Sequence, residues 1–354
     1  MRQERDRQLS ANPLTENEKD NSVSATKLSI APMMDWTDRH CRYFHRVLSR
    51  HVQLYTEMVT APALVRGNAT YLLDHDPHEH PVVLQLGGSE PEELAQAAKM
   101  GWDAGYREIN LNCGCPSDRV QSGCFGAVLM KRPDLVAEIC TAMRTACPAE
   151  ITVKCRIGVD DQVPEDVLPI FLERLQQAGI GHVIIHARKA WLQGLSPKDN
   201  REIPPLDYPL VLEMKRRFPD LRISLNGGIT DLDQACAFLE HGLDGVMIGR
   251  AAYQRPGDLL LGADERIFGA TTRISEAQAL DEMRHYTARE LAKGTRLASI
   301  TRHMLGLFSG QPGARQWRRI LSEQAHLPGA GLEVLDTAAA AVQHAQANFE
   351  PSLP

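Results

Sequence analysis

Two cysteines separated by one residue follow an apolar run in INLNCGCPS, residues 109–117. Thiols at this spacing suit three kinds of chemistry: a metal site, half of a disulfide framework, or a reactive group at an active-site mouth. A metal site usually needs a second spaced pair or clustered histidines, and "CGC" has no second pair at ligand spacing. Residues 1–26 are polar and lack the apolar segment of an export signal, so we expect a disordered tail, a cytoplasmic protein and free thiols. The sequence therefore favours the reactive group and predicts no metal site.

Cys115 is the better candidate of the two cysteines. Pro116 follows it and ends regular structure, and the next segment contains glycines that suit a mobile loop over an active site. A thiol with the ordinary pKa of about 8.5 is mostly protonated at neutral pH, so it can donate a proton as well as act as a nucleophile. We interpret Cys113 and Cys124 as packing residues.

The elements that must position Cys115 are eight short apolar runs that alternate with helical patterns. The runs are KLSIAPM, QLYTEMV, VVLQLGG, EINLNCG, ITVKCRIG, HVIIHAR, RISLNGGI and GVMIGRA. Eight such units in about 230 residues favour a (β/α)₈ TIM barrel over an open doubly wound sheet, and no G-x-G-x-x-G follows the first run. From about residue 272 the pattern is helical throughout, which predicts a small C-terminal all-helical domain. The expected division is a tail at 1–26, a barrel at 27–262 and a helical domain at 263–354.

In such barrels the active site lies at the carboxyl ends of the strands. Seven of the eight predicted strands deliver candidates there: Pro32, Met33 and Met34; Gln85; Asn112, Cys113 and Cys115; Lys154 and Arg156; His186 and Arg188; Asn226, Gly227 and Gly228; Gly249 and Arg250. Glycines after the seventh and eighth strands let backbone N–H groups approach a phosphate, and Arg250 adds a positive charge. The pattern predicts a phosphorylated ligand.

Lys154 leaves three interpretations open. An inward lysine near a phosphate site suits a Schiff base, and it equally suits the electron-rich end of a flavin ring. Gln85, Asn112 and His186 favour the flavin, because amides and an imidazole surround a flat heterocycle well. A lysine paired with an interior acid is the purely structural alternative.

Charge is distributed unevenly along the chain. The net charge is −6, but residues 284–319 hold eight basic side chains and one acid, which gives that segment +7 and the remainder −13. A localised basic face favours a polyanionic partner, although a solvated helical surface is the simpler interpretation. No apolar run approaches the roughly 20 residues that cross a membrane.

Several long motifs together resemble one known family. They are SIAPMMDWTDRHCRYFHRVLSRHVQLYTEMVTAPAL, NLNCGCPSDRVQSGCFGAVLM, VKCRIGVDD, IHARKAWLQGLSPKDNR, LNGGI, IGRAAY and ITRHMLGLFSGQPGARQWRR. With them, residues 27 to about 345 resemble the tRNA-dihydrouridine synthases, in particular the A subfamily. The resemblance implies an FMN-binding (β/α)₈ barrel that takes electrons from NADPH and reduces uridine in the tRNA D-loop, with positions 20 and 20a expected.

The resemblance also implies roles for individual residues. Cys115 is expected to protonate C5 of the uracil ring after hydride transfer from the N5 atom of FMN to C6. The implied FMN contacts are Pro32, Met33, Met34, Gln85, Lys154, His186, Asn226, Gly227, Gly228, Gly249 and Arg250. The implied tRNA contacts are Asn112, Lys198, Arg201, Arg315 and Arg318. The uridine must leave its own stack to reach the flavin, and the basic helical domain is expected to hold the tRNA elbow. We expect the protein to act on tRNA as a monomer.

Other functions remain as alternatives at this point. The second hypothesis is an FMN barrel that acts on a free pyrimidine or enone. Only the basic segment and the resemblance distinguish the tRNA-modifying enzyme from it. An RNA-binding module on a degenerate barrel leaves Cys115 and Lys154 without a purpose. A Schiff-base lyase makes no use of Cys115.

Overall fold

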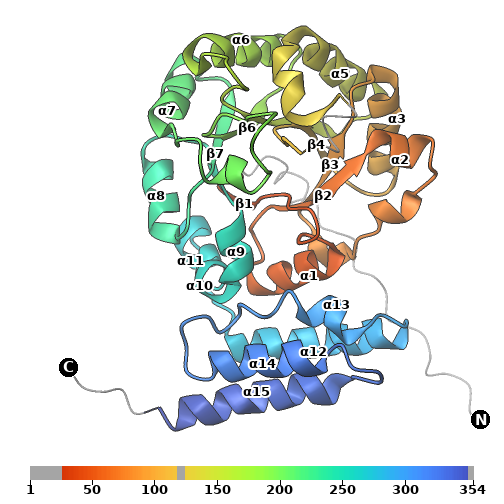
Figure 1. Ribbon diagram of the computed structural model, residues 1–354, viewed down its shortest axis with the longest axis vertical. Coiled ribbons are helices and arrows are strands. Elements are labelled where there is room, and N and C mark those ends of the chain that lie inside the picture. Colours follow the sequence, from red (N-terminus) through yellow and green to blue (C-terminus); the bar gives the residue numbers. More distant parts are fainter. Residues whose placement is uncertain (1–25, 118–123, 350–354) are drawn as a thin grey trace, which may run out of the picture.

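The computed structural model describes residues 26–117 and 124–349. A ring of helices surrounds a central barrel, and a layer of helices from the C-terminal part of the chain lies against one side of it (Figure 1). The predicted disordered tail lies outside the described residues except for residue 26.

Eight parallel strands form the barrel, as predicted. They are β1 Leu28–Ile30, β2 Leu54–Thr60, β3 Val82–Gly87, β4 Glu108–Cys113, β5 Glu150–Arg156, β6 His182–His186, β7 Arg222–Asn226 and β8 Gly245–Ile248. Strand β8 pairs with β1, and the circle closes between β1 and β2. At this closure the Ile30 backbone N–H donates to the Gln53 carbonyl at 2.9 Å, and Gln53 N–H donates to the Leu28 carbonyl at 3.0 Å.

The helices around the barrel follow the sequence pattern closely. They are α1 Arg39–Leu48, α2 Ala61–Val65, α3 Pro91–Asp103, α5 Pro133–Ala146, α6 Pro164–Gln177, α7 Tyr208–Arg217, α8 Leu232–Glu240, α9 Arg250–Gln254, α10 Pro256–Leu260 and α11 Ala263–Phe268. Short 3₁₀ helices occupy Thr70–Leu73 (η2), Pro77–Glu79 (η3), Gly126–Lys131 (η4) and Asp199–Arg201 (η5). Proline begins α3, α5 and α6, because it lacks the N–H group that has no partner at a helix start. Acidic side chains lie in the first turns of these helices, where the helix dipole favours negative charge.

The C-terminal part contains α12 Glu276–Ala292, α13 Leu297–Thr301, α14 Ala314–Gln324 and α15 Leu332–Ala347. The prediction of helix throughout this part is wrong for residues 302–313, which form turns. These turns press directly against the barrel. A Cβ on Gly306 would lie 2.2 Å from the Gln254 carbonyl oxygen, and one on Gly257 would lie 2.1 Å from that of Leu307. The close backbone approach, which only glycine permits, takes the place of helix there.

Helix α11 packs against α8 and α10 on the barrel side. We therefore place the division between barrel and helical part after Phe268, rather than at residue 262.

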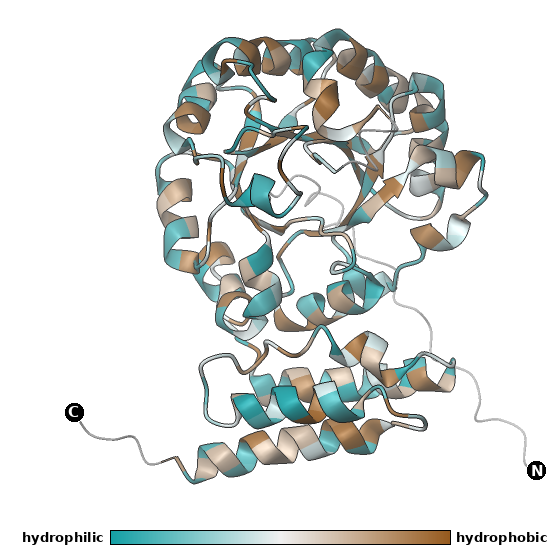
Figure 2. Ribbon diagram, viewed as in Figure 1, coloured by the Kyte–Doolittle hydropathy of each residue, from teal (hydrophilic) through white to brown (hydrophobic). Residues whose placement is uncertain are grey.

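Alternate residues of each strand point into the barrel. A small apolar layer fills its middle: Ala31, Tyr55, Val83, Ile184 and Met247. The larger core lies between strands and helices, and Figure 2 shows hydrophobic residues along the strands and hydrophilic ones over much of the outer surface. Inward polar side chains lie above and below the apolar layer. Those above it, at the carboxyl ends of the strands, form the candidate site.

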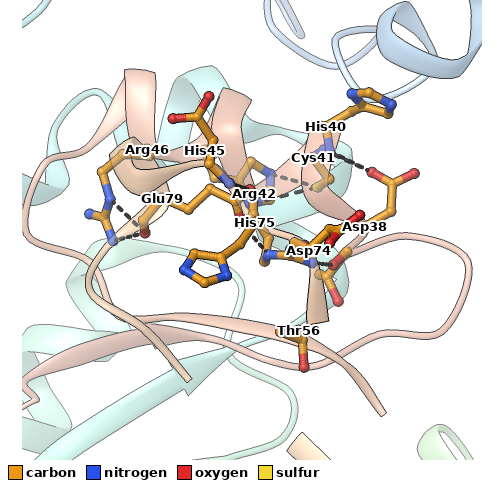
Figure 3. Close-up of polar contacts among 12 residues, drawn as sticks. Asp38, His40, Cys41, Arg42, His45, Arg46, Thr56, Asp74, His75 and Glu79 are labelled. Atoms are coloured by element: carbon orange, nitrogen blue, oxygen red, sulfur yellow. Dashed lines mark hydrogen bonds and ion pairs between the residues drawn. The ribbon is translucent and has the colours of Figure 1, made fainter. Parts of the chain in front are cut away.

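Helix α1 joins the barrel to its neighbours through buried polar groups (Figure 3). The Asp38 carboxylate caps α1 by accepting from the N–H groups of His40 and Cys41, both at 3.0 Å. One turn on, Arg42 Nε lies 2.6 Å from Glu79 Oε2, and both side chains are buried. The Arg42–Glu79 pair thereby ties α1 to η3, in the crossover between β2 and β3.

Candidate active site

Five of the predicted site residues meet at the upper rim of the barrel interior. Strand register places Asn112 beside Lys154 and His186 beside Asn226, while Gln85 comes from the neighbouring β3. Each lies at or near the carboxyl end of its strand and, apart from Lys154, is at most 8% exposed. The strand-end prediction therefore collected residues that are neighbours in space.

Gln85 and Asn112 hold each other in fixed orientations. Asn112 Nδ2 donates to Gln85 Oε1 at 2.9 Å, and Gln85 Nε2 donates to Asn110 Oδ1 at 2.8 Å. Each amide nitrogen carries two hydrogens, so each keeps one N–H outside these bonds. With the Lys154 ammonium, the site offers mainly hydrogen-bond donors. Such a set suits the carbonyl oxygens and imine nitrogens of a pyrimidine-like ring.

Lys154 has no ion-pair or hydrogen-bond partner within residues 26–117 and 124–349. Burial, and then the positive charge of Arg156, lower its pKa from 10.5 to about 8. Burial and the same arginine hold the pKa of His186 well below its usual value, so that imidazole is neutral. The alternative in which Lys154 pairs with an interior acid is not supported by the described residues. An anionic ligand would compensate this cation.

Gly227 and Gly228 are required by the backbone. Their φ angles are +113° and +74°, in the left-handed region that favours glycine. A Cβ on Gly227 would lie 2.6 Å from His186 Cδ2, and one on Gly228 would lie 2.5 Å from Leu206 Cδ1. Gly249 differs, since its φ is −104° and its nearest Cβ contact would be an ordinary 3.6 Å. Neither strain nor crowding demands a glycine at Gly249, and its missing side chain leaves room for a ligand.

Arg188 and Arg250 bring two guanidinium groups to this glycine region. Arg250 Nη1 lies 2.5 Å from Glu202 Oε1. Arg188 Nη1 donates to the carbonyls of Glu202 and Pro204, but its buried Nε has no partner in the described part of the chain. Burial and the nearby Arg250 lower the pKa of Arg188. Two adjacent cations and an unpaired donor suit a phosphate.

The structure places Cys115 at the rim of this site. Its backbone N–H donates to Asn112 Oδ1 at 3.0 Å, and its carbonyl accepts from the Ala127 N–H at 2.9 Å. The half-buried thiol lies 3.4 Å from Ser117 Oγ. Asn112 thus fixes the cysteine backbone directly beside the donor set.

The other two cysteines of this region differ from each other. Cys113 is fully buried, so its predicted packing role is confirmed. Cys124 is exposed, and the same prediction is wrong there, because its φ of +56° puts it in a turn that faces outward. All eight cysteines are free thiols.

Arg156 connects two loops of the rim, a role that sequence reasoning missed. Its Nε donates to the Gly114 carbonyl at 3.1 Å, and its Nη1 donates to the carbonyls of Lys189 and Asn200 at 3.1 and 2.8 Å. The cysteine loop after β4 and the long loop after β6 are therefore fixed to one buried guanidinium. The only sequence signal was its position two residues beyond Lys154.

The loop after β6 carries two predicted tRNA contacts, Lys198 and Arg201, and both are exposed. Asn200 between them is fully buried, and its amide pairs with the backbone N–H and carbonyl of Trp191 at 2.7 and 2.9 Å. Trp191 itself is 38% exposed, with Lys189 Nζ 5.2 Å from its ring. A rigid loop therefore displays cations and an aromatic face. The third predicted contact on the barrel, Asn112, is only 8% exposed.

The first strand supplies the remaining predicted contacts. Pro32 and Met33 are half-buried, and Met33 packs against the apolar layer of the barrel. Met34 is 56% exposed, and the next residue, Asp35, has a positive φ of 64°. This turn brings both methionines to the rim.

In the helical part, Arg315 and Arg318 are exposed on α14, together with Arg319. Trp317 between them is fully buried and donates to the Met304 carbonyl at 2.9 Å, so it is a core residue. Four other basic residues of the segment have acidic partners: Arg284 with Asp336, Arg289 with Asp76, Lys293 with Glu290 and Arg302 with Asp38. Within the described residues, the cations of α14 remain unpaired.

Two kinds of site find no support in the described ranges. No group of three or more His, Cys, Asp or Glu side chains there has metal-binding geometry. No helix among residues 26–117 and 124–349 is both long and apolar enough to cross a membrane.

Comparisons with known proteins point to one family. The family model described as dihydrouridine synthase (Dus) matches residues 29–346. A Vibrio cholerae protein named tRNA-dihydrouridine(20/20a) synthase is 56% identical over 320 residues, covering 90% of this chain and 97% of that protein. The Escherichia coli K12 protein of the same name is 56% identical over 314 residues, covering 88% and 90%.

A solved structure shares the fold at low sequence identity. The old yellow enzyme homologue from Zymomonas mobilis superimposes with a TM-score of 0.50 at 12% identity, over 72% of this chain and 92% of that one. This likeness concerns the fold alone. The family match and the identity of the relatives cover nearly all of the chain beyond residue 28, and on that basis the protein belongs to the dihydrouridine synthase family.

Proposed function

We propose that this protein is a cytoplasmic, FMN-dependent oxidoreductase that reduces uridine to 5,6-dihydrouridine in the D-loop of tRNA. Membership of the dihydrouridine synthase family supports the reaction. The relatives are named tRNA-dihydrouridine(20/20a) synthases, which supports positions 20 and 20a. NADPH is the proposed reductant.

The residues of the rim fit a flavin mononucleotide. Gln85 and Lys154 would donate to its pyrimidine edge, since both carry N–H groups without partners among the described residues. Gly227, Gly228 and Gly249 would admit its phosphate between Arg250 and the unpaired Nε of Arg188. The remaining contacts that we propose are Pro32, Met33, Met34, His186 and Asn226. When bound and reduced, FMN supplies a hydride equivalent to C6 of the uracil ring.

Cys115 supplies the proton that completes the reduction. Its S–H bond breaks as a C–H bond forms at C5, and the thiolate regains a proton from solvent. The hydrogen bond from its backbone to Asn112 Oδ1 positions the thiol at the rim, where an extruded uridine can reach it. Positioning of this kind makes proton transfer effectively intramolecular.

The tRNA would contact two separate surfaces of one monomer. Lys198 and Arg201 lie beside the entrance, with the mostly buried Asn112 behind them, and Arg315 and Arg318 are exposed on α14. Cations without acidic partners bind phosphates in a salt-dependent way. A substrate that spans both surfaces is larger than a free nucleoside.

The attachment of Cys115 to the donor-lined rim through Asn112 is the observation that carries this proposal. The test is anaerobic reoxidation of the reduced enzyme by unmodified tRNA and by free uridine, with dihydrouridine measured in the product. We expect fast reoxidation by tRNA only, and a Cys115→Ala enzyme that retains FMN and its reduction by NADPH but forms no dihydrouridine. Cys124→Ala, on the exposed cysteine of the same loop, is the matched control and should be active.

Two results would contradict the proposal. Normal dihydrouridine formation by Cys115→Ala would remove the proton-donor role. Reoxidation by neither substrate, in an enzyme that carries FMN, would favour a barrel oxidoreductase for a free small molecule.

A further inference from the structure

A continuous chain of side-chain hydrogen bonds runs down the inside of the barrel from the active-site rim. Below Gln85, Asn110 Nδ2 donates to Thr152 Oγ1 at 3.0 Å, and Thr152 Oγ1 donates to Glu108 Oε1 at 3.0 Å. Above Gln85, Asn112 links the chain to the backbone of Cys115. Glu108 and Cys115, at the two ends of this hydrogen-bonded series, are half-buried, and the other side chains in the series are at most 8% exposed.

Every bond in this chain has the same direction, and the rim end dictates it. At the rim, the N–H groups of Gly114 and Cys115 can only donate, so Asn112 must present its oxygen to them. At the base, the Thr152 oxygen accepts from Asn110, so its hydroxyl hydrogen is directed to Glu108 Oε1, which accepts it. The amides of Asn110 and Gln85 lie between these ends. Neither can be reversed without leaving a donor facing a donor.

We propose that Glu108 and Thr152 are positioning residues for the active site: they fix the Gln85 amide as a donor toward the flavin and the Asn112 oxygen as the acceptor that holds the Cys115 backbone. This inference rests on the proposed function for its consequence, but the chain itself does not depend on it. Neither residue touches the rim. Both act through the amides of Gln85, Asn110 and Asn112.

The surroundings of Glu108 agree with an acceptor at the base of the chain. Tyr55 Oη and Gln53 Nε2 each lie 3.5 Å from its oxygens and can donate to it, and the nearest charged groups are Glu150 and its partner Arg222. Burial, and then the charge of Glu150, raise the pKa of Glu108 to about 7. Desolvation of a carboxyl group is costly unless it is hydrogen-bonded, so the donors around Glu108 are needed there and a directing role explains its presence better than packing does.

The first experiment uses the flavin-free protein. Thr152→Val keeps the side-chain shape and removes the link, whereas Thr152→Ser keeps the hydroxyl. We expect backbone hydrogen exchange at Gly114 and Cys115 to become at least about fivefold faster in Thr152→Val, because Asn110 loses its acceptor and no longer fixes Gln85 and, through it, Asn112. Exchange should be unchanged in Thr152→Ser. Equal exchange in Thr152→Val and wild type would overturn the proposal.

The matched control is Ser224→Ala. Ser224 Oγ lies 2.8 Å from His182 Nε2 inside the same barrel, and no hydrogen bond among the described residues joins it to Gln85. This variant loses a buried hydroxyl of the same kind, so its exchange at Gly114 and Cys115 should match wild type. Faster exchange there in Ser224→Ala would mean that general loosening of the barrel is sufficient, and would also overturn the proposal.

The second experiment titrates FMN into the same variants and records the visible absorbance of the bound flavin. We expect Thr152→Val to bind about tenfold more weakly with a shifted spectrum, and Thr152→Ser and Ser224→Ala to bind within about twofold of wild type. A wild-type affinity and spectrum in Thr152→Val overturn the inference. Failure of the wild-type protein to bind FMN overturns the proposed function instead. The exchange measurement then still tests whether Thr152 holds the backbone of Gly114 and Cys115.

Should Thr152→Val fail to fold, Glu108→Met provides the same test. Its side chain has no strong acceptor for the Thr152 hydroxyl, so exchange at Cys115 should rise and FMN affinity should fall, by smaller factors than in Thr152→Val. Wild-type values for both measurements in Glu108→Met would overturn the proposal.

Discussion

Two regions of this molecule contain clusters of basic side chains, and the partners of those side chains differ between the two regions. The first is the α1 seam, which we define as α1 with its polar partners in η3, α12 and the turn after α13. There three cations have a carboxylate, Arg42 with Glu79, Arg39 with Glu290, and Arg302 with Asp38, while the buried Arg46 donates to backbone carbonyls. Tyr43 and Tyr286 add a stacked pair, with ring centroids 3.9 Å apart. The seam is complete without any ligand.

The second region is the mouth of the barrel. Lys154, Arg156 and Arg201 have no acidic partner in the described ranges, and Arg250 alone is paired, with Glu202. Burial and repulsion from neighbouring cations lower the pKa values of Lys154, Arg156 and the more exposed Arg201. Such an arrangement destabilises the protein alone and stabilises a complex with an anion.

The difference shows how charges that build the fold can be distinguished from charges that serve a ligand. A buried cation that the chain itself neutralises contributes to the structure. A buried cation with neither a carboxylate nor backbone carbonyls as partners, such as Lys154, indicates an anionic partner from outside, here the ring of the proposed cofactor. Substitutions in the two regions should therefore change stability in opposite directions.

The largest effect is expected at the seam. Glu79→Ala would leave Arg42 buried without its carboxylate and should lower the free energy of unfolding by about 3–5 kcal/mol, measured by urea denaturation. Glu93→Ala is the control, since Glu93 pairs with the exposed Arg66 and should barely move the midpoint. Similar midpoints for both variants would contradict the importance of burial.

At the mouth, Lys154→Met should instead stabilise the flavin-free protein. The lysine pKa falls from 10.5 to about 8 on folding, and one pKa unit equals about 1.4 kcal/mol, so the gain at pH 7 is up to about 3 kcal/mol. Below pH 8 the lysine is charged in both states and the penalty is complete. Between pH 8 and 10.5 only the unfolded state keeps the proton, so wild-type stability rises and the advantage of Lys154→Met should vanish.

Urea denaturation of both proteins from pH 7 to pH 10 measures this difference. The same variant should also lose FMN. A stability difference that stays constant with pH would show that the lysine is not the source.

Asp38→Asn should have a smaller effect. Asparagine still caps α1, so the change removes the charge that faces Arg302 and His303, at a cost of about 2 kcal/mol near pH 7. Burial alone would raise the pKa of Asp38, but His303 and then Arg302 hold it well below its usual range. The stabilisation is therefore present above about pH 4 and lost at lower pH. Unfolding at pH 7 and pH 3 checks this, and an equal deficit at both would contradict it.

The smallest effect on stability is expected on α14. Arg315→Ala with Arg318→Ala should leave unfolding unchanged, because both side chains are exposed and unpaired, while tRNA binding weakens and its salt slope falls by about 1–2. Arg284→Ala is the matched control, since that arginine is paired with Asp336. An unaltered salt slope in the double variant would move the tRNA surface elsewhere.

The sequence predicted much of this architecture because its signals are local. Each strand is a short β-branched run, and its last residues must point toward one end of a parallel barrel. That rule alone brought Gln85, Asn112, Lys154, His186 and Asn226 into one group. The helix prediction failed at residues 302–313, where Gly306 contacts Gln254 across the domain boundary and no local sequence pattern indicates the contact.

Charge pairing was not predictable in the same way. The segment 284–319 appeared uniformly basic, yet Arg302 finds Asp38 at a distance of 264 residues along the chain, and Arg289 finds Asp76 213 residues away. Of the basic side chains in this segment, only Arg296 and the α14 arginines have no acidic partner among the described residues. Arg156 is a similar case, because its three carbonyl acceptors lie on two separate loops.

The amino-acid sequence by itself determined the barrel, the order of its strands and the residues that line its mouth, because the period of apolar residues and the ends of strands are read within a few positions. Only the tertiary structure decided which cations are neutralised and which wait for an anion, and how Glu108 is connected to Cys115. Those outcomes depend on distances between atoms that are far apart in the chain, and electrostatic and hydrogen-bond energies follow distance in space.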